Sequence, residues 1–226
     1  TGRGFLFVNN YQDHVDGIEQ KDFAITVHTD QGTVRVPEEG ALNLPKGNNA
    51  IWPVWFDFHG CLLKYATAQL VTKVSKDKKD YYFFVQTGND RSEFVFQEEN
   101  LDLQTHIGCR RNGSKILLEK DTISTFSFTG TDGTACIICT LPERYGLRLW
   151  QIDTNEKRLL FLSDSPVLYK DGQLELEYHC NEELEIGIFP SNSDMIRLGG
   201  HTLSSLGTNG VFQMFESWRE EKELPF

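Results

Sequence analysis

The chain begins TGRGFLFVNNY (Thr1–Tyr11), and this stretch sets the expectation for the whole fold. Gly2 and Gly4 flank a single arginine, and the four residues Phe5–Val8 then run apolar without a break. A short aromatic and β-branched run between glycine and asparagine predicts a β-strand that is buried on both faces.

The position of this run also bears on how the chain begins. The ends of ordinary domains are polar and fray unless something ties them down. A buried strand this close to residue 1, together with the missing initiator methionine, leads us to expect an internal fragment of a longer protein.

Strand-like segments follow one another along most of the chain. The densest is AIWPVWFDFHG (Ala50–Gly60). A period of two places four of its apolar side chains on one face, namely Trp52, Val54, Phe56 and Phe58. Further strand-like runs are Phe23–His28, Thr33–Val36, Tyr81–Val85, Glu93–Phe96, Ile116–Leu118, Cys136–Cys139 and Leu184–Phe189. Many short strands joined by tight turns predict a mainly β fold of antiparallel sheets, sandwich-like or barrel-like.

Helical periodicity is clear in one place. Thr140 and Glu143 have the spacing of a capping box, and a proline between them is tolerated in a first helical turn. Three larger apolar side chains then recur at intervals of four, at Leu141, Tyr145 and Leu149. We therefore expect one principal helix near residues 141–150.

This helix divides the expected fold in two. Residues 1–150 form a larger β domain that ends in the short helix. Residues 151–226 form a smaller β meander with a Gly/Ser-rich C-terminal segment, and Lys170-Asp171-Gly172 is a hairpin turn within it. Because the meander has too few residues to bury a large core alone, we expect it to need the larger domain.

Composition and charge limit the kinds of partner. The net charge of −11 argues against nucleic acid, which needs a basic face, and against anionic membrane surfaces. No apolar run reaches the roughly 20 residues that a bilayer span needs, and no signal peptide is present. The compartment stays open, with a periplasmic or secreted parent protein as one alternative.

Residues suited to catalysis or metal binding are present but scattered. The six histidines form no His-x-His or His-Glu-x-x-His pair. Cys136 and Cys139 form a C-x-x-C within an apolar run, where a strand would point them to opposite faces, so ordinary core cysteines are favoured. Carboxylates lie in surface-like runs such as Glu38-Glu39, and none are paired for a glycosidase cleft. We expect no catalytic residue, no metal ligand and no cofactor.

Aromatic side chains are the remaining candidates for a binding site, because flat rings stack on the apolar faces of sugars. The candidate carbohydrate-binding residues are Trp55, Tyr81, Tyr82 and Trp150. Trp52 shares the face of Val54, which favours the core, whereas Trp55 lies on the opposite face and is the better surface candidate. A role in the core or between domains is the alternative for these aromatic residues.

Several segments resemble a known family in their order and spacing. They are Gly4–Gln12 (GFLFVNNYQ), Val36–Gly40 (VPEEG), Ile51–Pro53 (IWP), Leu63–Gln69 (LKYATAQ) and Glu93–Phe96 (EFVF). Together they resemble the β-rich region that follows the catalytic barrel in bacterial β-galactosidases of glycoside hydrolase family 35. Leu147–Trp150 followed by Leu162–Asp164 is similar to the end of that region, where a helix leads into a short meander.

The resemblance implies a retaining β-galactosidase as the parent protein, with two catalytic glutamates at strand ends of a (β/α)₈ barrel. This chain has no β/α alternation, and Asn155-Glu156 and Asn181-Glu182 lie in expected turns rather than in a barrel. The resemblance therefore implies a non-catalytic accessory domain whose partner is the catalytic barrel of the same parent chain. An independent carbohydrate-binding module and a protein-interaction β-sandwich remain alternatives.

Overall fold

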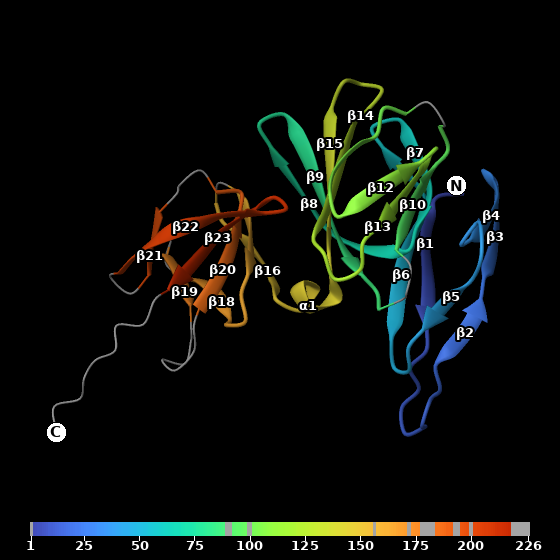
Figure 1. Cartoon of the computed structure of the whole chain (residues 1–226), viewed down its shortest axis with the longest axis horizontal. Coiled ribbons are helices and arrows are strands. Elements are labelled where there is room, and N and C mark those ends of the chain that lie inside the picture. The colour runs from blue at the N-terminus through green and yellow to red at the C-terminus, as the bar shows by residue number, and fades with distance from the viewer. Residues whose placement is uncertain are drawn as a thin grey trace. The chain divides into compact units, whose positions relative to one another are not determined.

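The computed structural model describes residues 2–88, 92–98, 101–155, 157–170, 173–176, 184–191, 195–198 and 201–217. The chain divides into two compact units, Thr1–Gly146 and Leu147–Phe226, which we call unit 1 and unit 2 (Figure 1).

Unit 1 contains two large sheets. Sheet 1 has the order β1-β6-β7-β10-β13-β12, formed by β1 (Gly4–Asn9), β6 (Asn49–Phe58), β7 (Cys61–Ala66), β10 (Glu93–Phe96), β13 (Lys115–Leu118) and β12 (Cys109–Asn112). Sheet 2 has the order β11-β14-β15-β9-β8, formed by β11 (Gln104–Ile107), β14 (Ser124–Thr129), β15 (Ala135–Leu141), β9 (Lys79–Gln86) and β8 (Ala68–Lys76). Among these strands only β15 and β9 pair in parallel. The predicted mainly β, antiparallel fold is confirmed, and the described strands form open sheets rather than a closed barrel.

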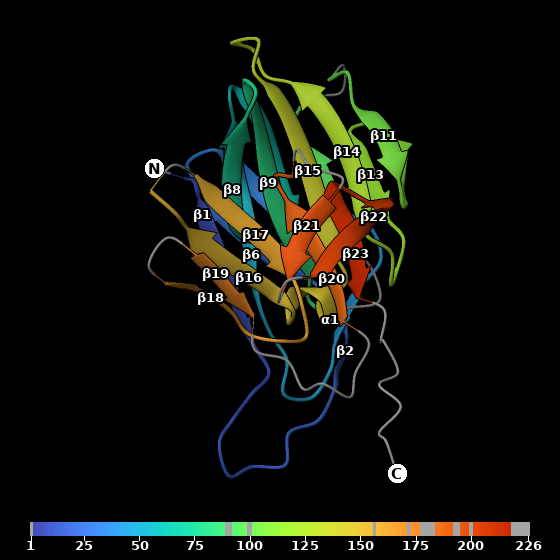
Figure 2. The same cartoon turned by 90° about the vertical axis from the view of Figure 1, so that its left-hand side faces the viewer.

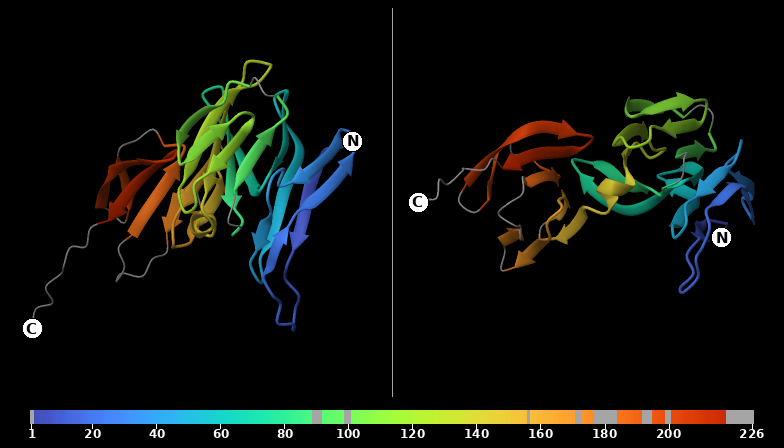
Figure 3. Two further views of the ribbon diagram at one scale, coloured as in Figure 1. Left: turned by 45° about the vertical axis from the view of Figure 1, so that its right-hand side comes forward. Right: turned by 60° about the horizontal axis from the view of Figure 1, so that its bottom comes forward.

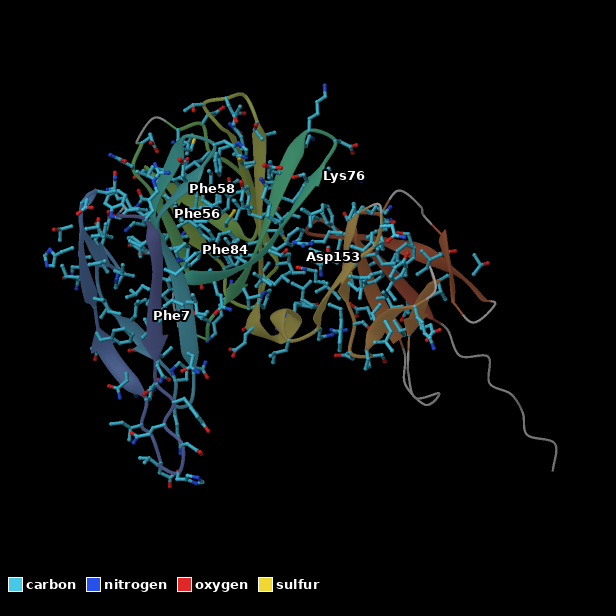
Figure 4. The ribbon with its side chains drawn as sticks, turned by 180° about the vertical axis from the view of Figure 1, so that it is seen from behind. Phe7, Phe56, Phe58, Lys76, Phe84 and Asp153 are labelled. Atoms are coloured by element: carbon cyan, nitrogen blue, oxygen red, sulfur yellow. The ribbon has the colours of Figure 1, made fainter. Side chains whose placement is uncertain are left out.

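The first core of unit 1 lies between the two large sheets and is rich in phenylalanine. Phe58 of sheet 1 and Phe84 of sheet 2 are fully buried in it, and Figure 4 shows both rings inside the unit. Phe94 stands edge-on to Phe84, with ring centroids 4.8 Å apart, and to Phe126, with centroids 5.2 Å apart. Each such pair contributes about 0.5–1.5 kcal/mol beyond the area that it buries.

A second core covers the other face of sheet 1. Two small sheets lie over that face, β2 (Gln20–Phe23) with β5 (Leu42–Leu44) and β3 (Ile25–Thr29) with β4 (Gly32–Val36). In Figure 3 these blue strands lie beside the teal strands of sheet 1. Because both faces are covered, β6, β7 and β10 have nearly continuous apolar sequences rather than alternating ones.

Strand β1 confirms one part of the sequence prediction and corrects another. The strand exists, pairing with β6 from Gly4 opposite Val54 to Asn9 opposite Asn49. The prediction that it is buried on both faces is wrong, because Phe5 is 46% exposed and Phe7 is 74% exposed. Only the alternate residues, such as Leu6, pack against the second core. As the edge strand of sheet 1, β1 has a covering layer on one face alone.

The predicted helix exists but is much shorter than expected. Helix α1 spans Glu143–Gly146, within the range 141–150, and the amides of its last two residues donate to the Pro142 carbonyl. Leu141 is the last residue of β15, where it pairs with Val85 of β9. The strand ladder therefore holds residues that the periodicity had placed in the helix, because sheet pairing outweighs a local helical preference.

Gly146 allows helix α1 to pack closely against sheet 2. A Cβ atom at this position would lie 2.5 Å from Cγ1 of Val85, closer than real carbon atoms come. The glycine that lowers the helical propensity of this segment is thus needed for packing against β9.

Unit 2 is also built from β-strands, drawn from amber to red in Figure 2. Its main sheet has the order β16-β17-β20-β23-β22-β21, formed by β16 (Leu149–Asp153), β17 (Arg158–Leu162), β20 (Leu184–Phe189), β23 (Phe212–Ser217), β22 (His201–Asn209) and β21 (Met195–Leu198). A separate pair is formed by β18 (Val167–Lys170) and β19 (Gln173–Leu176). Asp171 and Gly172 of the predicted turn lie outside the described residues. The Gly/Ser-rich stretch contains strand β22, which its composition did not indicate.

Candidate functional site

Trp55, the preferred surface candidate, lies in the second core of unit 1. Its side chain is only 5% exposed and packs in the same cluster as Trp52. Trp55 has a φ of +54°, which is unusual within a strand. On the neighbouring strand β7, the pairing with β10 passes over Lys64, so the register shifts there. This irregularity turns Trp55 to the same side as Trp52, so the prediction that period two keeps them on opposite faces is wrong. The prediction that Phe58 shares the face of Trp52 is wrong for the same reason, because Phe58 packs in the first core.

The other three candidate aromatics have different surroundings. Tyr82 is 5% exposed and belongs to the first core, where its ring stands edge-on to Phe58 at 4.7 Å. Tyr81, its neighbour on β9, is half-buried. Trp150 on β16 is half-buried against the core of unit 2, and its Nε1 donates to the Ser163 carbonyl at 3.0 Å. Tyr81 and Trp150, the two partly exposed rings, belong to different units.

The exposed face of β1 is the apolar surface that sequence reasoning missed. We call Phe5, Phe7, Ile51 and Phe56 the β1 apolar face. Phe7 pairs across the ladder with the half-buried Ile51, and the ring of Phe5 lies 6.3 Å from that of Phe56. Figure 4 shows Phe7 and Phe56 on neighbouring strands of sheet 1. Cross-strand partners point to the same side of a sheet, which makes this a continuous surface.

Two further features lie next to β1. The loop at residues 10–19 follows β1 and carries three more exposed apolar side chains, Tyr11, Val15 and Ile18. An open groove of about 330 Å³ lies beside β1, lined by Gly2–Leu6, Val27–Asp30 and Val54. Because Arg3 of the groove is already paired with Asp57 at 2.8 Å, it is not a free cation for an acidic ligand.

Unit 1 contains one fully buried carboxylate among its described residues, the side chain of Glu93. Glu93 on β10 is completely buried and accepts a hydrogen bond from the Tyr65 hydroxyl at 2.5 Å. Lys115 lies 3.8 Å from Glu38 and 4.0 Å from both Glu39 and Glu93, so three carboxylates face one ammonium group. Burial, followed by the charge of Glu93, raises the pKa of Tyr65. A carboxylate with no exposed surface cannot reach a glycosidic bond, so this cluster is structural.

A second polar cluster joins three hairpins of unit 1. His59, in the turn between β6 and β7, contacts Asp132 through Nδ1 at 2.9 Å and Asp80 through Nε2 at 2.6 Å. Asp80 also accepts from Lys73 at 2.5 Å and from Ser75 at 2.6 Å. The spacing of 73 residues between His59 and Asp132 left no signal in the sequence.

The charges of this cluster shift its pKa values in opposite directions. Hydrogen bonds to Asp132 and then to Asp80 raise the pKa of His59. Hydrogen bonds from Thr134 and then from His59 lower the pKa of Asp132 to about 2. Burial alone would raise the pKa of Asp80, but hydrogen bonds from Lys73, Ser75 and His59 outweigh it and lower that pKa.

The described ranges contain no group of three or more His, Cys, Asp and Glu side chains that could hold a metal ion. In the same part of the chain, no helix has the length and apolar character that crossing a membrane requires.

Residues 1–141 match the family model described as "Beta-galactosidase, domain 2". The chain belongs to this family. A search of curated proteins finds no match to it.

The extent of the match agrees with the fold of this β-galactosidase domain 2. Residue 141 is the last residue of β15, so the matched residues contain both large sheets and both cores of unit 1. Helix α1 and unit 2 follow the matched residues. Membership identifies the chain as a non-catalytic accessory domain of a β-galactosidase-like protein.

Proposed function

We propose that this chain is an accessory module of a retaining β-galactosidase of glycoside hydrolase family 35, and that it packs against the catalytic barrel of the same parent protein. The observation that carries the proposal is the β1 apolar face, with Phe5 and Phe7 exposed in a domain of the β-galactosidase family. The sequence resemblance supports family 35 and a bacterial source.

The chemistry of β1 favours a protein partner. Proteins usually protect an edge strand with charged side chains or proline, because its outer backbone groups can pair with another chain. Strand β1, GFLFVN, carries neither. Large exposed apolar surfaces in otherwise soluble domains mark interaction sites. An apolar face on an unprotected edge strand therefore supports permanent packing against another domain.

The competing proposal is carbohydrate binding by exposed aromatic rings. A sugar platform needs the open face of a ring, and Trp55 and Tyr82 are too deeply buried to provide one. This alternative then depends on Tyr81 and Trp150, which belong to different units. Binding of the chain to a glycan array, lost on substitution of either residue by Ala, would favour it over barrel packing.

The proposal can be tested by producing the parent protein's catalytic barrel and this chain as two separate polypeptides. Calorimetry should detect their association, and the double variant Phe5→Ser/Phe7→Ser should weaken it at least tenfold. Leu206→Ser is the matched control, because Leu206 of unit 2 is 59% exposed and lies outside the β1 apolar face. The chain alone should hydrolyse no chromogenic β-galactoside.

Two results would overturn the proposal. One is a parent protein that has no catalytic barrel. The other is association that the Phe5→Ser/Phe7→Ser variant retains in full, while circular dichroism confirms that the variant is folded.

A further inference from the structure

Three hairpins of unit 1 meet at His59. His59 belongs to the β6–β7 turn of sheet 1, whereas Asp80 and Asp132 belong to β9 and to the β14–β15 turn of sheet 2. We propose that His59, Asp80 and Asp132 form a pH-sensitive clasp that fastens the two sheets of the sandwich when the imidazole is protonated.

The hydrogen bonds define the charge state of His59. An ionised carboxylate can only accept hydrogen bonds, and both ring nitrogens of His59 face one. A neutral imidazole has a single N–H, so it could donate to Asp80 or to Asp132 but not to both. Both contacts, at 2.6 Å and 2.9 Å, therefore require the imidazolium ion.

The backbone around His59 is shaped to make these contacts. The His59 carbonyl accepts hydrogen bonds from the amide and the hydroxyl of Thr131, at 2.8 Å and 3.1 Å. Gly60 has a φ of +85°, and a Cβ there would lie 2.0 Å from Oγ1 of Thr131. The β6–β7 and β14–β15 turns thus touch directly, and the imidazolium adds a charged link from them to β9.

Several charged or titratable groups surround His59. The other charged or titratable groups are Asp57 and Cys61 beside His59, Lys73 on β8, Asp80 and Tyr82 on β9, Asp132 in its turn, and Cys136 on β15. Burial raises the pKa of the Cys61 thiol and of the Tyr82 phenol. It also raises the pKa of the Cys136 thiol, to about 12. These three groups are therefore neutral where His59 titrates, while Lys73 holds Asp80 as an anion.

The pH window of the clasp follows from the direction of each shift. The pKa of His59 is raised above 6.5, so its stabilisation is complete below pH 6.5 and is lost as the pH rises through the folded-state value. The pKa of Asp132 is lowered to about 2, so its stabilisation is lost only as the pH falls from 3.8 toward 2. The clasp thus stabilises the fold in mildly acidic solution, and this contribution is lost as the pH rises through the folded-state pKa of His59.

Nuclear magnetic resonance of the whole chain tests the charge state directly. The ring-nitrogen signals of His59 should show both nitrogens protonated at pH 6, with a midpoint above pH 6.5 that falls in Asp132→Asn. His28 and His106 are internal controls, because each bonds a hydroxyl, of Thr33 and Ser127, through one ring nitrogen. Their ring-nitrogen chemical shifts at a fixed pH should not change in Asp132→Asn. A His59 midpoint at or below 6.5 in the wild-type chain would overturn the proposal.

The pH dependence of stability tests whether the clasp fastens the fold. His59→Gln keeps one side-chain donor but cannot titrate. The ratio of the wild-type to the variant unfolding constant should therefore rise between pH 6 and 9, by a factor of ten for each unit by which folding raises the pKa of His59. An unchanged ratio would show that His59 is a passive hydrogen-bonding residue, and the proposal would fail.

Discussion

Replacing Phe94 by alanine tests the phenylalanine core most severely. Phe94 is fully buried and lies edge-on to Phe84 and Phe126. A buried Phe→Ala substitution costs about 3–5 kcal/mol, and the loss of two edge-to-face contacts places Phe94→Ala near 4–5 kcal/mol. Phe94→Leu keeps most of the volume and should cost about 1–2 kcal/mol.

Urea unfolding followed by tryptophan fluorescence measures these losses, because Trp52 and Trp55 lie in unit 1. Phe7→Ala is the matched control, since it makes the same chemical change at a side chain that is 74% exposed. It should change the free energy of unfolding by at most about 0.5 kcal/mol. The account of the core would be refuted if Phe94→Ala cost no more than Phe7→Ala.

Two further predictions concern the helix and the units. Gly146→Ala should destabilise the chain by about 1–3 kcal/mol in thermal or urea unfolding, because the new methyl group would collide with Val85. Gly4→Ala, where a Cβ meets nothing within 4 Å, should be nearly neutral, and equal effects would contradict the proposed packing. We also propose that residues 1–150, which contain unit 1, fold alone, since they hold both sheets and both of its cores. If the 1–150 fragment is unfolded while the whole chain folds cooperatively, the proposal that residues 1–150 fold alone is wrong.

The local parts of the fold were predictable from the sequence. The hairpin of β3 and β4 has its turn at Asp30 and Gln31, and the turn before β15 contains Asp132-Gly133, as the turn residues indicate. The motifs that resemble a β-galactosidase region lie largely within the residues matched by the family model. These features depend on near neighbours in the sequence, which composition and spacing record.

Features that depend on distant residues were not predictable. The extent of the helix depends on Leu141 pairing with β9, and the burial of Trp55 depends on a positive φ within a strand. An apolar run such as Phe5–Val8 indicates a strand but not whether a second layer covers each face. The contact of His59 with Asp132 exists only after both sheets have assembled.

Hydrogen–deuterium exchange of the parent protein tests the central claim most directly. The isolated chain and the whole parent protein would be compared at Gly4–Asn9, with β22 (His201–Asn209) as the internal reference. If the β1 apolar face packs against the catalytic barrel, the amides of Gly4–Asn9 should exchange at least tenfold more slowly in the parent protein, and those of β22 should not change. Equal exchange of Gly4–Asn9 in the two proteins would contradict the claim.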